Sequence, residues 1–259
     1  LDTMLGTALR EPEGVFPYRY LVPGGSGYSH TMWDWDAYFL GVGLLSVRPE
    51  YASYLEGTAR NFLHAALPDG FIPNNIEADG TGFIALTRQG QPMNPTKPVI
   101  ASMLATATRV SGELHLRPDE WDRLQRFVGY WEVNQRHASG LYLVNSHRGS
   151  GPDNDPAVYG RPPRSTALTL TNALMVRELE SMSQLAERLD PEAAVGYAAK
   201  ARELRGRVND RMWDNEDEIY YSQDVGYRTP HIGLGVRQHT ETWSTTLKVR
   251  TGSSFAMLW

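Results

Sequence analysis

The chain has 259 residues, of which 41% are hydrophobic and 21% charged, a composition typical of a soluble globular protein with a sizeable core. Its net charge of −5 and the lack of a basic run argue against a nucleic-acid partner, and the lack of cysteine excludes disulfides, thiolate catalysis and cysteine-based zinc sites. No stretch is typical of a signal peptide or a transmembrane helix, so we expect a cytoplasmic protein without a membrane partner.

The first thirty residues are rich in Gly, Pro and Tyr and show no helical period, and residues 23–27 predict turns. Beyond them, apolar residues recur at helical spacing in six segments, which predicts three pairs of helices. These helices are expected at 35–42, 55–66, 100–110, 121–131, 168–189 and 194–208. Long polar loops at 68–96 and 138–165 separate the pairs, and one short strand-like run lies at 219–222.

A chain of helical hairpins can form a bundle, a solenoid or a toroid. Solenoids have short, repeated connections, whereas the loops here are long and no sequence repeat is visible. Long loops in compact domains are usually functional. We therefore predict an all-α toroid, with residues 1–259 in a single domain and the loops building a site at one rim.

The first polar cluster lies at residues 28–39, where two Trp and two Asp alternate at the expected start of a helix. An Asp there can cap the helix by accepting amide protons of its first turn. The alternative is sugar binding, because indole faces cover the apolar face of a pyranose and carboxylates accept hydroxyl protons. Both interpretations can hold together, and the candidate sugar-binding residues are Trp33, Trp35 and Asp36.

Two further polar stretches, 70–75 and 91–98, lie near the two ends of the first long loop. Asn74 and Lys97 offer recognition of hydroxyl and carboxylate groups. On their own these residues are explained as well by a solvated loop.

The second long loop carries Asp153 and Asp155 in backbone stiffened by prolines. A rigid backbone suits a carboxyl group that must be held still to donate a proton. Because Asp, Asn, Gly and Pro are also the usual turn residues, the residues alone favour a turn over a catalytic site. Tyr159, Arg161 and Arg164 follow in the same segment as candidates for substrate contacts.

No metal or other cofactor is expected. The seven His are scattered and lack the helical pair spacing of a zinc protease, and residues 214–218 lack the glycine and ligand spacing of a calcium loop. No serine nucleophile elbow occurs, and the glycines at 24–27 lack the flanking elements of a phosphate-binding loop.

Taken together and in this order, the polar clusters resemble glycoside hydrolase family 63, most closely its bacterial glucosylglycerate and mannosylglycerate hydrolases. The resemblance is carried by residues 18–25, 32–36, 70–74 and 151–156, and extends to about residue 225. More distantly, the same order is similar to the trehalases of family 37.

The resemblance implies an inverting α-glycosidase on an (α/α)6 toroid that hydrolyses a small anionic or neutral glycoside, such as glucosylglycerate or mannosylglycerate. It places the general acid on Asp153 and so favours catalysis over a plain turn there. It places Trp35 and Asp36 in the −1 sugar site, and the Asn that trehalases carry after Ile-Pro matches Asn74.

A glycerate aglycone would need a cation opposite its carboxylate, for which Arg161, Arg164 and Lys97 are candidates. The acid of an inverting enzyme must also be protonated near neutral pH. Burial among Trp rings, or the like charge of Asp155, would favour the protonated form of Asp153.

The general base of this family is a Glu much later in the chain, and no residue here matches it, since Glu241 lies too early. Six helices make about half of a six-hairpin toroid. We therefore expect a catalytic domain truncated at its C-terminus that does not turn over substrate alone. Its uncovered helix faces would favour association into a homo-oligomer.

Three rival functions remain. A non-catalytic sugar-binding module using the same Trp-rich cleft needs no base, and its saccharide binding would not depend on Asp153. A sugar epimerase or polysaccharide lyase on the same toroid would normally use His or Tyr bases, and the His here do not cluster. A helical scaffold for protein partners predicts apolar grooves in place of Asp-rich loops and fits least.

Overall fold

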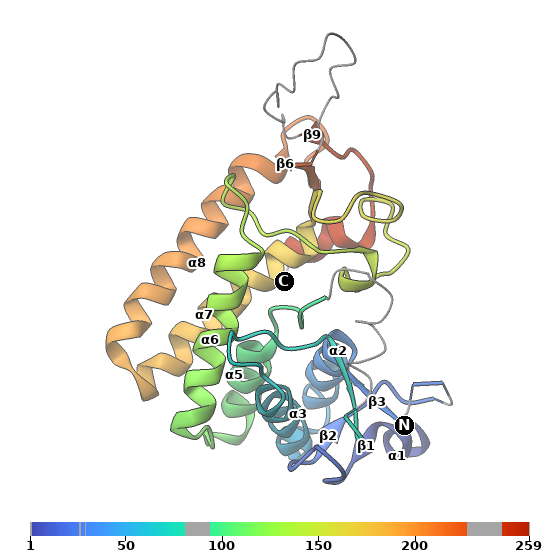
Figure 1. Ribbon diagram of the computed structural model, residues 1–259, viewed down its shortest axis with the longest axis vertical. Helices are drawn as coiled ribbons and strands as arrows, with labels where there is room; N and C mark the ends of the chain where they lie inside the picture. Colours follow the sequence, from blue (N-terminus) through green and yellow to red (C-terminus); the bar gives the residue numbers. More distant parts are fainter. Residues whose placement is uncertain (1, 26, 29, 81–93, 227–244, 259) are drawn as a thin grey trace. The chain divides into compact units, whose positions relative to one another are not determined.

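The structure is a computed structural model of the chain, shown in Figure 1. The described residues are 2–25, 27, 28, 30–80, 94–226 and 245–258. The chain divides into two compact units, which are described separately. Unit 1 comprises Leu1–Asn134 and Leu174–Arg202, and unit 2 comprises Gln135–Ala173 and Glu203–Trp259.

Helices dominate the described residues, as predicted. They are α1 (Asp2–Ala8), α2 (Asp34–Leu45), α3 (Ala52–His64), α5 (Ile100–Ser111), α6 (Pro118–Asn134), α7 (Thr169–Leu189) and α8 (Pro191–Met212). Short 3-10 turns are η1 (Pro49–Tyr51), η2 (His147–Gly149) and η3 (Gly252–Leu258). Each of the six predicted helices is confirmed, from α2 to α8.

The first thirty residues show no helical period in the sequence, yet Asp2–Ala8 forms the helix α1. This helix has seven residues, too few for an apolar period to show in the sequence. Leu5 and Ala8 are buried in it.

In unit 1, α3 packs against α2, α5 and α6, which lie beside one another in the lower part of Figure 1. The buried residues of α3 and α5 recur three or four positions apart, so that each helix turns one apolar face inward. They are Leu55, Ala59, Phe62 and Leu63 in α3, and Ile100, Met103, Leu104 and Ala107 in α5.

Short antiparallel strand pairs connect segments of the loops. In unit 1, β1 (Leu9–Arg10) pairs with β2 (Tyr20–Leu21), and β3 (Thr31–Trp33) pairs with β4 (Asn75–Glu77). In unit 2, β5 (Thr166–Ala167), β8 (Gln223–Asp224) and β9 (Thr245–Thr246) form one sheet, and β6 (Trp213–Asp214) pairs with β7 (Ile219–Tyr220). The strand-like run predicted at 219–222 is confirmed as β7; the other strands are too short to show alternation in the sequence.

In unit 2, the first turns of α7 hold the second long loop and the C-terminal segment. The buried Asn172 accepts a hydrogen bond from the backbone N of Tyr142 at 2.8 Å and donates one to its carbonyl at 3.0 Å. The Thr169 hydroxyl donates to the carbonyl of Ser253 at 2.8 Å. The loop is therefore tied to a rigid helix.

In unit 1, a buried carboxylate of α7 fixes the beginning of α5. Glu178 accepts hydrogen bonds from the backbone N of Ala101 at 2.7 Å and of Ser102 at 2.9 Å, and from the Ser102 hydroxyl at 3.0 Å. These amides are free donors at a helix N-terminus, where negative charge is stabilised. Burial nonetheless raises the pKa of Glu178 to about 7, against the lowering effect of these hydrogen bonds.

Candidate active site

The first polar cluster forms a corner between β3 and α2. Trp33 is extended and immediately precedes the helix, which begins at Asp34. The backbone N of Asp34 donates to the carbonyl of Asn74 at 3.1 Å, and one carboxylate oxygen accepts from the backbone N of Trp35 at 2.6 Å. Asp34 therefore satisfies a free amide of the first turn, the role that the sequence allowed for one of the two Asp.

Asp34 also forms a buried ion pair with Lys97. The Lys97 Nζ lies 3.1 Å from the nearer carboxylate oxygen, and the Lys97 backbone N donates to the other oxygen at 2.6 Å. Asp34 is completely buried and the Lys97 side chain is 4% exposed. The sequence makes Lys97 a candidate to bind a carboxylate of the substrate. In the structure it binds the carboxylate of Asp34 instead.

The chain before Lys97 is clamped to the other end of the first long loop. Thr96 donates through its backbone N to the carbonyl of Ile72 and through its hydroxyl to the carbonyl of Pro73, both at 2.6 Å. The indole N–H of Trp131 in α6 donates to the Thr96 carbonyl at 3.1 Å. Gly70 precedes this region with a φ of 91° and touches α6 so closely that a Cβ atom would lie 2.1 Å from a backbone oxygen.

The predicted sugar-binding residues lie around this framework in unit 1. Trp35 and Asp36 begin α2 and are partly exposed, and the Trp35 ring meets the Phe39 ring edge-on at 5.2 Å. Asn74 is buried next to β4. The predicted stretch 91–98 is described only from Asn94 onward, so residues 91–93 lie outside the described residues.

In unit 2, the two aspartates of the second long loop differ sharply in exposure. Asp155 is buried and accepts hydrogen bonds from the backbone N of Ala157 at 2.9 Å and from the Thr251 hydroxyl at 3.2 Å. Asp153 is exposed, in a turn closed by a hydrogen bond from the Asp155 backbone N to the Pro152 carbonyl at 3.0 Å. Asp153 is not buried among Trp rings, as the sequence had suggested it could be. Its carboxylate instead stands on a hydrogen-bonded turn.

The basic residues of this loop have different partners. Arg161 forms an ion pair with Asp224, whose side chain is 8% exposed. The exposed Arg164 donates to the side-chain oxygens of Gln135 at 3.1 Å and Asn145 at 3.4 Å, both of them neutral amides. Tyr159 is 63% exposed, with its ring edge-on to that of His147 at 5.3 Å.

Of two structural carboxylates that the sequence did not single out, Glu178 carries a weak signal in the sequence and Asp224 carries none. Glu178 follows Met175 by three positions and precedes Met182 by four, which places it on the apolar stripe of its helix. A carboxylate on such a stripe predicts a buried hydrogen-bonded group. Asp224 shows no comparable signal, because its partner Arg161 lies 63 residues away.

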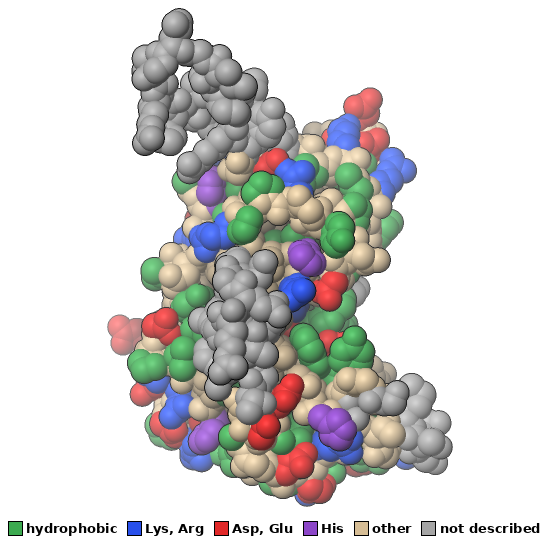
Figure 2. Space-filling view, turned by 45° about the vertical axis from the view of Figure 1, so that its right-hand side comes forward, with side chains coloured by type: hydrophobic (Ala, Val, Ile, Leu, Met, Phe, Trp, Pro, Cys, Tyr) green, Lys and Arg blue, Asp and Glu red, His purple; other side chains and the backbone are tan. Residues whose placement is uncertain are grey.

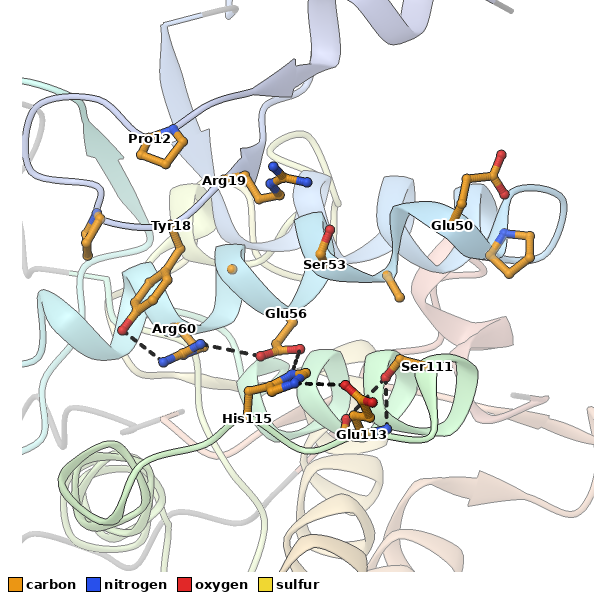
Figure 3. A pocket seen from close by; sticks show the side chains of 14 residues that line it. Pro12, Tyr18, Arg19, Glu50, Ser53, Glu56, Arg60, Ser111, Glu113 and His115 are labelled. Atoms are coloured by element: carbon orange, nitrogen blue, oxygen red, sulfur yellow. Dashed lines mark hydrogen bonds and ion pairs between the residues drawn. The ribbon is translucent and has the colours of Figure 1, made fainter.

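Unit 1 also contains an open cavity of about 700 Å³ at which none of the predicted site residues lies. Tyr18, Glu56, Arg60, Glu113 and His115 contribute to its wall, and Figure 3 shows these charged groups turned toward one another. The Arg60 guanidinium lies 3.9 Å from the centre of the Tyr18 ring and 3.5 Å from Glu56. These charged side chains are therefore paired with one another, and the sequence predicted no function for them.

His115 at this cavity is expected to make stability depend on pH. Its two ring nitrogens lie 3.1 Å from Glu56 and 3.0 Å from Glu113, and the hydrogen bond and charge of Glu56 raise the pKa of His115 above its usual 6.5. A raised folded-state pKa gives stabilisation that is complete below the unfolded-state pKa and is lost as the pH rises through the folded-state pKa.

We therefore predict that His115→Gln lowers the thermal midpoint slightly at about pH 5 and leaves it unchanged at about pH 9. The control is His64→Gln, since His64 ends α3 with no carboxylate partner among the described residues. Equal effects of His115→Gln at both pH values would rule out the ionic contribution.

On the face drawn in Figure 2, acidic and basic side chains of the described residues are interspersed. Within the part of the chain that the structure describes, no group of three or more His, Asp or Glu could hold a metal ion. No helix among these residues is both long and apolar enough to cross a membrane.

The sequence model of one protein family matches residues 28–256 of the chain. That family is described as the mannosylglycerate hydrolase MGH1-like glycoside hydrolase domain. The match spans all the candidate site residues named above. A comparison with curated proteins found no match.

Solved structures of glycosidases have a similar fold. The GH63 mannosylglycerate hydrolase of Thermus thermophilus in complex with glucose is 17% identical, with a TM-score of 0.58, over 96% of this chain and 68% of that chain. Its complex with Tris and D-glycerate is 18% identical, with a TM-score of 0.59, over 92% and 68%. The neutral trehalase of Saccharomyces cerevisiae is 15% identical, with a TM-score of 0.56, over 81% of this chain and 49% of that chain.

At these identities, the likeness shows the fold alone. These neighbours are toroids of helical hairpins, so the predicted all-α toroid class is confirmed.

Proposed function

Since the chain belongs to the mannosylglycerate hydrolase MGH1-like glycoside hydrolase family, and is therefore a glycoside hydrolase, we propose that a protein containing it cleaves a small glycoside such as mannosylglycerate or glucosylglycerate with inversion at the anomeric carbon. Inversion requires one carboxylic acid to protonate the leaving oxygen and a second carboxylate to activate water on the opposite face of the ring. We assign the acid to Asp153 and leave the second carboxylate unassigned in this chain.

The observation that carries this assignment is the contrast between Asp155 and Asp153. Asp155 is buried, and its carboxylate accepts hydrogen bonds from Ala157 of the same loop and from Thr251 of the C-terminal segment. Two residues earlier, the Asp153 carboxylate is exposed on the turn that Asp155 fixes. A proton donor has to be both accessible to substrate and held in place, and Asp153 combines the two.

For the sugar ring, we propose contacts with Trp33, Trp35, Asp36 and Asn74. Trp35 and Asp36 are partly exposed at the beginning of a helix whose first residue is locked by Lys97. Such a framework supports an indole face and a carboxylate in fixed positions, as recognition of a pyranose requires. Lys97 is then proposed to act on the sugar site indirectly, through Asp34.

For an aglycone carboxylate, Arg164 is the best candidate of the three cations. Lys97 and Arg161 both form ion pairs with largely buried carboxylates, whereas Arg164 bonds to neutral amide oxygens and has no ion pair with a described carboxylate. Its exposed guanidinium can form a bidentate pair with a carboxylate. Tyr159, exposed five residues earlier, is proposed as a neighbouring contact.

We further propose that residues 1–259 belong to one catalytic domain, since the family match spans residues of both units. We also propose that this domain acts in the cytoplasm. The proposed partners are the glycoside and further copies of the chain. Neither a cofactor nor a nucleic acid enters the proposal.

Binding of D-glucose and D-mannose tests the sugar contacts. Trp35→Ala is expected to weaken binding by about tenfold or more, because a large aromatic contact in a fixed position carries much of a binding energy. Titration of the purified protein, followed by NMR, measures this change. Trp213→Ala, which removes an exposed indole that is not among the proposed contacts, should leave binding unaltered. Equal affinities for wild type and Trp35→Ala would reject the contact.

A further inference from the structure

Two buried polar atoms beside the Asp34–Lys97 pair have no partner among the described residues: the indole Nε1 of Trp33 and the side-chain Oδ1 of Asn75. Asn75 as a whole is 6% exposed. A buried polar group without a hydrogen bond costs about 1–3 kcal/mol, and native structures contain few of them. Two such atoms in neighbouring residues therefore call for a common explanation.

The pairing of β3 with β4 brings the two residues together. Trp33 lies directly opposite Asn75, and Met32 lies opposite Ile76. Side chains of directly opposite residues in an antiparallel pair project from the same face. Met32 and Ile76 are both buried on the other face, which fixes the register, since a slip by one residue would exchange the two faces.

The surroundings hold both residues in place. Asp34, next to Trp33, is bonded through its backbone to Asn74, next to Asn75, and through its side chain to Lys97. The Tyr28 ring meets the Trp33 ring edge-on at 6.3 Å. These contacts hold in place the backbone from which both side chains project.

The two atoms have complementary chemistry. An indole N–H can only donate a hydrogen bond, and an amide oxygen can only accept one. A hydroxyl group satisfies both at once, because it accepts and donates. We propose that Trp33 and Asn75 together bind one hydroxyl of the sugar ring, so that Asn75 is a specificity-determining residue; this rests on the proposed function.

The test follows the indole N–H resonance of Trp33 by NMR, assigned through Trp33→Phe, while D-glucose, D-mannose and their monodeoxy analogues are added to the protein. Formation of a hydrogen bond shifts this resonance downfield. We expect a downfield shift with at least one parent sugar, and no such shift with the one analogue that lacks the bound hydroxyl. The Trp213 indole, already bonded to Asn215, provides an internal reference.

Asn75→Leu separates binding from folding, because leucine fills similar space without a polar atom. It should weaken binding of the parent sugar by at least about fivefold and leave binding of the deoxy analogue unaltered. Its thermal midpoint should equal or exceed that of the wild type, since an unsatisfied group has been removed. Asn75→Asp, which keeps the acceptor, should retain discrimination between the parent sugar and the deoxy analogue.

If sugars shift other resonances but neither shift the Trp33 indole nor distinguish Asn75→Leu from the wild type, the inference is wrong while the proposed function stands. If none of the sugars shifts any resonance, the sugar site itself is rejected and the inference falls with it.

Discussion

Asp153→Asn is expected to lower the hydrolysis of mannosylglycerate and glucosylglycerate by about 10²- to 10⁴-fold in a protein that contains this chain, because an amide cannot donate the proton that the leaving oxygen needs. The side chain is exposed, so folding should be unaffected. Binding of D-glucose should be retained, which would place the loss in kcat rather than in KM.

Asp119→Asn is the matched control, since Asp119 is an exposed carboxylate in α6. It should leave both kinetic constants unaltered. An Asp153→Asn variant with wild-type kcat would reject the assignment of the acid. A variant that loses sugar binding as well would make Asp153 a substrate ligand, a result that neither the proposed acid nor a binding module independent of Asp153 predicts.

Lys97→Met is expected to destabilise the protein by about 3–5 kcal/mol, because removal of one partner from a buried ion pair leaves the other charge without compensation. Asp34 would then be a fully buried carboxylate that, among the described residues, has no ion-pair partner and is bonded only through the backbone N–H groups of residues 35 and 97. The corner between β3 and α2 should loosen, so that sugar binding at Trp35 and Asp36 weakens as well. Urea unfolding, followed by circular dichroism, measures the change in stability.

Lys200→Met removes an equally long cation from an exposed pair with Glu132, in which the Lys200 side chain is 47% exposed, and should change stability by less than about 1 kcal/mol. The double variant Asp34→Asn, Lys97→Met should be less destabilised than the sum of the single variants. If Lys97→Met is as stable as the wild type but no longer binds D-glycerate, Lys97 binds substrate directly and the indirect role is wrong.

The helices could be predicted from the sequence because each long helix carries an apolar stripe. The stripe of α3, from Leu55 to Leu63, is an example. The strands β3 and β4 could not, since three residues give no alternation and their pairing depends on segments more than 40 residues apart. The seven-residue helix α1 could not be predicted for the same reason of length.

The candidate site also has features that could be predicted from the sequence and features that could not. Residue type and local order make Trp35 and Asp36 candidates for sugar binding, and the family resemblance assigns them to the −1 site and Asp153 to the role of general acid. The sequence does not reveal that Lys97 forms an ion pair with Asp34, because the two residues are 63 positions apart and meet only when the loops are folded. Nor does the spacing of Asp153 and Asp155 indicate that one is exposed and the other an internal anchor, since both stand in the same turn-rich composition.

The most direct test of the proposed function uses a protein that contains this chain. The hydrolysis of mannosylglycerate and glucosylglycerate is followed by NMR, with trehalose for comparison, to identify the sugar anomer that appears first. An inverting enzyme with Asp153 as its acid should release the β-anomer from an α-glycerate glycoside, and Asp153→Asn should abolish this release. Initial release of the α-anomer, or hydrolysis that continues unchanged in Asp153→Asn, would contradict the mechanism.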